Sequence, residues 1–80
     1  MKQPPDPGGP PTPKVEYANY FQVGHNGVEV VLDFGYGYDE EHAALHTRIV
    51  TTPRYAKAFL ELLGESLARY ERAFGPIATE

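Results

Sequence analysis

The sequence predicts an α+β fold, in which a three-stranded antiparallel sheet, made of a hairpin and one further strand, is packed by one long C-terminal helix. Three observations support this. Two segments with alternating apolar residues flank Asn26-Gly27, a third segment is rich in β-branched residues, and the last has apolar residues at helical spacing. With 80 residues the chain makes one domain. We place this single β-β-β-α domain at residues 15–80.

The N-terminal segment, residues 1–14, predicts a disordered tail rich in proline and glycine. Residues 3–13 hold six of the eight prolines and no apolar residue to bury. Proline cannot donate a backbone hydrogen bond, so a disordered or polyproline-like segment is expected. A ligand for a proline-recognising domain is the functional alternative, which PPTP and PDPGGP fit loosely.

Residues 17–35 predict a β-hairpin, since Asn26 and Gly27 suit the two left-handed positions of a type I′ turn. With these two residues as the loop, the facing pairs are His25 with Val28, Val23 with Val30, Phe21 with Leu32 and Asn19 with Phe34. Cross-strand partners share a face. One face then carries Phe21, Val23, Val30, Leu32 and Phe34, and the other carries Tyr20, Gln22, Val31 and Asp33. We expect the apolar face to lie beneath the helix.

Residues 35–42 predict a solvated acidic loop, and residues 44–52 predict the third strand. For that strand we favour an inward face made of Leu45, Thr47, Ile49 and Thr51. Asn19 falls on the apolar face, where a buried amide needs hydrogen-bond partners. We expect a structural bond from Asn19 to the helix or to the 35–38 loop, with a ligand or partner contact at the sheet edge as the alternative.

The C-terminal helix has clear start and stop signals. Thr52 suits the N-cap, Pro53 the first helical position and Gly75-Pro76 the end, which gives about 22 residues and roughly 33 Å. Its apolar seam comprises Ala56, Phe59, Leu60, Leu63, Leu67, Tyr70 and Phe74. Gly64 lies inside the helix, where a glycine often lets another backbone come close.

A sandwich of one helix on a three-stranded sheet is too thin to make a stable monomer. A three-stranded sheet leaves two open edges, and a short chain buries a modest fraction of its surface. The helix is also longer than three strands can cover. We therefore expect the chain to form a homo-oligomer.

The segments YANYFQVG, VEVVLDFG and HTRIVTTPRYAKAFLELLGESLARYERAFGPI together resemble domain-of-unknown-function family 3467, a group of small bacterial proteins. The matching features are Tyr17-Ala18-Asn19, Leu32-Asp33-Phe34-Gly35, Thr52-Pro53 with Ala56-Lys57, and Tyr70-Glu71 with Phe74-Gly75. The resemblance covers residues 15–77 and departs at the proline-rich tail and the DEEH loop. It implies the same fold and a bacterial, cytoplasmic origin, and it implies no activity.

The composition of the chain argues against several classes of function. The chain has no cysteine, which excludes disulfides and fits a reducing compartment. It has no apolar run of about 20 residues and no signal-peptide core, so we expect a cytoplasmic protein without a membrane segment. The formal charge is −4, and residues 1–14 carry +1, so residues 15–80 carry −5. An acidic body makes nucleic-acid binding unlikely.

The sequence contains only weak signals of catalysis and of metal binding. His42 and His46 lie four apart beside acidic residues, but on a strand that spacing separates them by about 13 Å. Ser66 is the only serine and sits within the helix. We therefore predict no enzyme activity, no cofactor and no metal.

The preferred hypothesis is a non-enzymatic, oligomeric protein-interaction or assembly module that binds copies of itself and an unknown protein partner. Its predicted partner-binding residues are Tyr20, Gln22, Val31, Tyr36 and Tyr38. One alternative is a peptide-holding chaperone like SecB, to which the strand and helix order is similar. The other is a small-anion or nucleotide sensor at the helix N-terminus, formed by Arg48, Thr52, Arg54 and Lys57.

Overall fold

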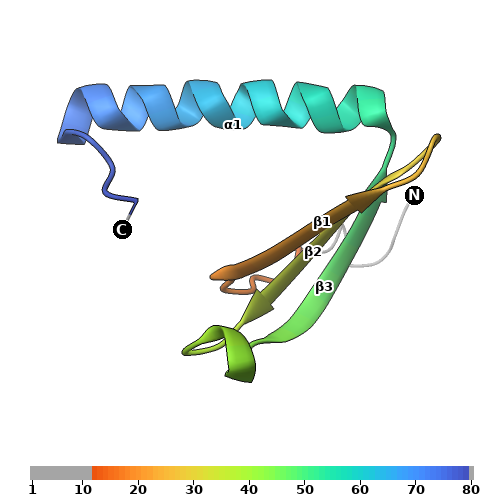
Figure 1. Ribbon diagram of the computed structural model, residues 1–80. Helices are drawn as coiled ribbons and strands as arrows, with labels where there is room; N and C mark the ends of the chain where they lie inside the picture. The colour runs from red at the N-terminus through yellow and green to blue at the C-terminus, as the bar shows by residue number, and fades with distance from the viewer. Residues whose placement is uncertain (1–11, 80) are drawn as a thin grey trace.

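The computed structural model describes residues 12–79 and contains three strands followed by one long helix (Figure 1). The elements are β1 (Tyr20–His25), β2 (Val30–Tyr36), the single 3-10 turn η1 (Glu40–His42), β3 (Ala44–Thr51) and α1 (Pro53–Phe74). The strands form one antiparallel sheet in the order β1-β2-β3. The predicted fold class is thereby confirmed in its elements. The predicted disordered tail falls mainly on residues 1–11, which lie outside the described residues.

The hairpin loop is longer than predicted. His25 pairs with Val30, so the loop contains the four residues from Asn26 to Glu29. The Asn26 side-chain oxygen accepts hydrogen bonds from the backbone N–H groups of Val28 and Glu29, both at 2.8 Å. Neither Asn26 nor Gly27 has a positive φ, so the predicted type I′ turn is wrong. An asparagine side chain that bonds backbone groups two and three residues on favours this wider loop.

The wider loop shifts the strand pairing by two residues but keeps the two faces of the hairpin. Phe21 now pairs with Phe34, and Val23 pairs with Leu32. Side chains alternate with a period of two, so an even shift leaves each on its original face. The apolar sheet face of β1, β2 and β3 therefore consists of Phe21, Val23, Val30, Leu32, Phe34 and Ile49.

The third strand contains an irregularity that changes the face of one residue. Thr47, Ile49 and Thr51 pair with residues of the apolar sheet face, as predicted. Between Phe34 and Gly35 the register shifts, and Leu45 pairs with Gly35. A β-bulge of this kind inserts one extra residue into one strand. Leu45 therefore lies on the opposite face, and its prediction as an inward residue is wrong.

Gly35 is needed where β3 bulges against β2. It is buried, and a Cβ added there would lie 2.5 Å from the carbonyl oxygen of Ala44 and 3.0 Å from its carbonyl carbon. Backbone atoms cannot yield as a flexible side chain does, so Gly35→Ala is expected to destabilise the fold by about 1–3 kcal/mol. Gly24→Ala is the matched control, because nothing lies within 4 Å of a Cβ at that strand position. Urea unfolding of both variants measures the difference, and equal midpoints would contradict the prediction.

An ion pair lies on the face opposite the apolar one. Asp33 and Arg48 are direct cross-strand partners. Arg48 donates from Nε to Oδ1 of Asp33 at 2.8 Å and from Nη2 to Oδ2 at 2.9 Å. The Asp33 residue is 7% exposed. These hydrogen bonds lower the pKa of Asp33 below its usual value, and the charge of Arg48 acts in the same direction.

Acid is expected to weaken the fold through Asp33. Its pKa is lower in the folded chain than in the unfolded chain, where it is about 3.9. The stabilisation is therefore present above the unfolded pKa and is lost as the pH falls through the folded pKa. Asp33→Asn removes this titration, so the fall in melting temperature from about pH 5 to about pH 3 should be smaller than in the parent chain. Thermal unfolding followed by circular dichroism measures it, and an equal fall in both proteins would contradict it.

The helix has the predicted bounds and caps. The Thr52 side chain accepts a hydrogen bond from the Tyr55 backbone N–H at 3.2 Å, and Pro53 begins the helix. At the other end Gly75 has a φ of 99° and donates from its backbone N–H to the carbonyl of Glu71 at 2.8 Å. A left-handed glycine commonly ends a helix. Both helix termini are therefore encoded by local sequence.

The position of α1 differs from the prediction. The helix begins one residue after β3, at the end of the sheet, and from there it diverges from the strands at an angle (Figure 1). None of its residues is buried, and it does not pack along any strand. Thr52 alone joins the two elements, and its backbone is extended. The helix and the sheet diverge from this junction, so the expected packing of the helix on its own sheet is wrong.

Candidate functional site

The most informative feature of the surface is the apolar area that this single chain leaves uncovered. In the range 12–79, no apolar side chain is buried. A folded soluble domain normally hides such side chains in a core, and large exposed apolar patches mark interaction sites. The candidate functional site therefore consists of two exposed apolar surfaces, one on the sheet and one on the helix.

The first surface is the apolar sheet face. Val23 is 71% exposed and Phe21 is 58% exposed, whereas Leu32 and Phe34 on the central strand are half-buried. The rings of Phe21 and Phe34 meet edge to face, with their centroids 5.8 Å apart. The cross-strand pairing makes this face a continuous patch over β1, β2 and β3.

The second surface is a band of apolar residues along α1, which we call the helix stripe. It comprises Ala56, Phe59, Leu60, Leu63, Leu67, Tyr70 and Phe74. Phe74 is 75% exposed and Leu60 is 67% exposed. At helical spacing these residues span an arc of about 100°, which is typical of a helix face that meets another element. The opposite face carries charged residues, which are Arg54, Glu61, Glu65, Arg69 and Arg72.

Three of the residues predicted from sequence to bind a partner lie on the other face of the sheet. Tyr20, Gln22 and Val31 alternate with the residues of the apolar sheet face. The Gln22 side chain donates from Nε2 to the Tyr20 hydroxyl at 2.8 Å, and Val31 is half-buried. Asp33 and Arg48 share this face. It is thus more polar than the apolar sheet face, and its polar side chains already bond to one another.

The other two predicted partner-binding residues, Tyr36 and Tyr38, are exposed at the far end of the sheet. The Tyr36 ring meets the Tyr17 ring edge on, with centroids 5.4 Å apart. The Tyr38 ring stacks on the His42 ring at 4.5 Å. Tyr17, Tyr36 and Tyr38 line one shallow hollow. Tyr20, Gln22 and Val31 do not line this hollow, so the five residues do not form one patch.

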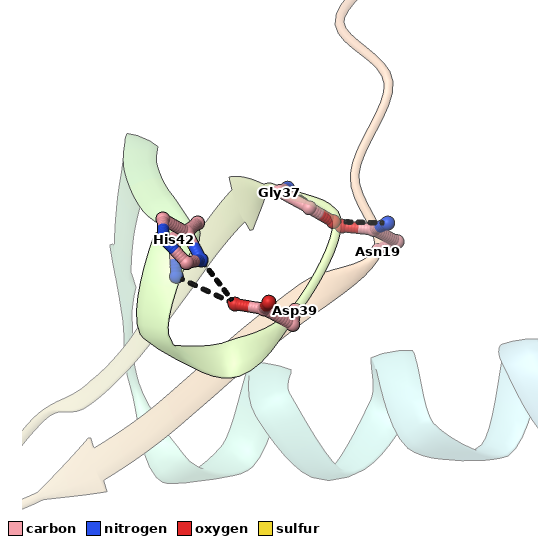
Figure 2. A network of polar contacts seen from close by, with 4 residues as sticks. All are labelled: Asn19, Gly37, Asp39 and His42. Atoms are coloured by element: carbon pink, nitrogen blue, oxygen red, sulfur yellow. Dashed lines mark hydrogen bonds and ion pairs between the residues drawn. The ribbon is translucent and has the colours of Figure 1, made fainter.

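Two pairs of polar contacts hold the loop at residues 37–42 (Figure 2), and one of them joins two residues that line that hollow. Asn19 donates from Nδ2 to the carbonyl of Gly37 at 2.9 Å, and the Gly37 N–H donates to Asn19 Oδ1 at 3.2 Å. The predicted structural bond from Asn19 to the 35–38 loop is therefore confirmed. Asp39 accepts from the His42 backbone N–H at 2.9 Å, and His42 Nδ1 lies 2.7 Å from Asp39 Oδ1. These hydrogen bonds hold the loop in one conformation.

The role of Asp39 was missed in the sequence, although a signal for it existed. The acidic cluster was interpreted as solvated, yet Asp39 caps the turn η1. An aspartate placed three residues before the amide it bonds is a standard capping pattern. His46, the other histidine of the metal hypothesis, donates from Nε2 to the carbonyl of Tyr17 at 2.9 Å. Both histidines therefore have partners within the chain.

The predicted anion corner has two of its four side chains engaged elsewhere. Arg48 pairs with Asp33 on the sheet, and the Thr52 hydroxyl caps the first turn of α1. Arg54 and Lys57 follow on that first part of the helix. Anion binding by this corner stays a prediction.

The described residues also bear on metal binding and on insertion into a membrane. Within residues 12–79, no three histidine or acidic side chains gather in a way that suits a metal ion. Over the same range, no helix combines the length and the apolar character that crossing a membrane requires.

The comparisons with known proteins agree with the resemblance seen in the sequence. A family model described as "Protein of unknown function (DUF3467)" matches residues 9–79. No curated protein and no solved structure matches the chain.

Proposed function

Because the chain belongs to the DUF3467 family, whose function is unknown, its role has to come from its own surfaces, and we propose a non-enzymatic assembly module that works as a homo-oligomer. One observation carries this proposal. Residues 12–79 bury no apolar side chain, although both the sheet and the helix have a well-formed apolar face. A surface of this kind is stable in water only when something covers it.

A second copy of the same chain is the partner that fits best. Among the residues that the structure describes, no helix covers the apolar sheet face, and no strand packs along the helix stripe. Each copy therefore offers what the other lacks, which is the condition for a closed symmetric assembly. A sheet can cover most of the length of the helix, since the eight residues of β3 extend for about 26 Å and the 22 residues of α1 for about 33 Å.

The energetic argument supports obligate assembly. Burying one large apolar side chain stabilises a structure by about 1.5–3 kcal/mol, and a whole domain is stable by only about 5–15 kcal/mol. The helix stripe and the apolar sheet face together carry more than ten apolar side chains that are exposed or half-buried. Whether these apolar side chains are covered therefore decides whether the chain folds. Folding and assembly should be one event.

This coupling gives the test. Light scattering and sedimentation over a range of chain concentrations are expected to show an oligomer. The melting temperature should rise with chain concentration, because dilution favours separated, unfolded chains. A folded monomer at every concentration would sink the proposal. In that case the peptide-holding alternative would gain, since the exposed faces would be free to bind other chains.

A further inference from the structure

Gly64 is an unexplained residue at the centre of α1. It stands 11 residues after Pro53 and ten before Phe74. Glycine destabilises a helix interior relative to alanine. Apart from its chain neighbours and the adjoining helix backbone, nothing in the described residues lies within 4 Å of the place where a Cβ would stand, so no tertiary contact among them requires a glycine. Leu60 and Leu67 lie beside it on the helix surface, because residues three and four apart are neighbours.

One pair of opposite charges is placed symmetrically about Gly64. Lys57 lies seven residues before it and Glu71 seven residues after it. Seven residues make nearly two full turns, so these three residues follow one line along the helix. That line borders the helix stripe on the side of Leu60 and Leu67. A second helix meeting this side would therefore place charges of one copy beside charges of the other.

The signs of these charges select the direction of a helix pair. Consider two copies that lie antiparallel around a two-fold axis at Gly64. A residue that precedes Gly64 in one copy then meets the residue that follows Gly64 by the same number of positions in the other copy. Lys57 of each copy then stands beside Glu71 of the second copy. In a parallel pair Lys57 would face Lys57, and Glu71 would face Glu71. Like charges at such positions are unfavourable and opposite charges are favourable, so the antiparallel pair is preferred.

We propose that two copies of the chain pair through antiparallel α1 helices that cross at Gly64. This inference rests on the proposed function and names its interface. The missing Cβ lets the two backbones approach closely, with Leu60 and Leu67 of both copies packed around the crossing point. The other flank of the helix stripe, with Phe59, Leu63 and Tyr70, remains available to cover a sheet.

Disulfide cross-linking tests the crossing point directly, because the chain contains no cysteine. In Gly64→Cys, the two thiols of a dimer would lie within bonding reach across the two-fold axis. Glu65→Cys is the matched control, since the next residue points to the charged face. Under mild oxidation we expect the first variant to form the covalent dimer at least about tenfold faster than the second. Equal rates would overturn the proposed crossing.

Charge reversal tests the pairing without changing Gly64. Lys57→Glu and Glu71→Lys should each raise the dissociation constant by about tenfold, because every dimer contains two such pairs. The double variant should restore it to within a few-fold of the parent chain. Glu71 also accepts a hydrogen bond from the Ile77 N–H, and loss of that bond would not be rescued by a change at Lys57. Rescue therefore reports the contact between copies.

The two proposals fail in different ways. An oligomer by sedimentation, with neither preferential cross-linking at position 64 nor rescue in the double variant, would reject the helix crossing and leave assembly standing. A folded monomer would reject both.

Discussion

Replacing Leu63 by aspartate is expected to abolish assembly and, with it, cooperative unfolding. Leu63 lies in the middle of the helix stripe, between Phe59 and Leu67. Truncating a covered leucine costs about 2–5 kcal/mol, and an unpaired carboxylate cannot be buried without a further cost. A dimer contains the change twice, so its dissociation constant should rise by at least about 10³-fold. Light scattering measures the loss of assembly, and circular dichroism measures the loss of cooperative unfolding, with parent and variant at the same chain concentration.

The control for this variant is Ala58→Asp. Ala58 lies on the charged face of the same helix, so the new side chain and its effect on helix propensity are matched. Because an exposed carboxylate stays in water, the control should assemble normally and lose less than about 1 kcal/mol of stability. If Leu63→Asp assembled as well as the control, the helix stripe would not be an interface.

The elements of this fold could be predicted from sequence because each is set by nearby residues. Thr52, Pro53 and Gly75 determine where α1 begins and ends through bonds and backbone angles within one turn. The sheet faces follow from the alternation of side chains, which tolerated the error in the hairpin loop because that error was two residues. An error of one residue would have exchanged the faces.

The predictions of the hairpin turn and of the face of Leu45 were wrong because two local arrangements compete at each place. Asn26 suits a left-handed turn position, yet its side chain can also bond two backbone amides, and the second arrangement occurs here. The bulge that moves Leu45 arises where β2 and β3 meet, and Gly35 permits the close approach of Ala44. Composition alone does not distinguish these outcomes.

The candidate site was harder to predict because it depends on the position of α1. Sequence reasoning placed the helix on its own sheet, which left Tyr20, Gln22 and Val31 as the free face. In the structure the helix does not pack along any strand, although only Thr52 separates it from β3. The apolar sheet face is then exposed as well, and the nominated face has polar side chains that bond each other.

A pair of substitutions in β2 is expected to show which sheet face becomes covered. Leu32 and Val31 are adjacent, both are half-buried, and they point to opposite faces. In the proposed oligomer the partner helix covers Leu32, so Leu32→Asn would bury an amide with no hydrogen-bond partner in place of an apolar side chain. We expect a loss of about 2–4 kcal/mol per copy and a dissociation constant at least about 10²-fold higher.

Val31→Asn is the matched control, because it places the same side chain one residue away on the more polar face. The amide there stays in contact with water, and we expect a loss below about 1 kcal/mol and an unchanged oligomer. Sedimentation at several concentrations, together with urea unfolding, compares the two variants. The reverse order of effects would place the interface on the face of Tyr20, Gln22 and Val31. The helix stripe would then need another surface to cover it, because the polar side chains of that face do not complement an apolar helix.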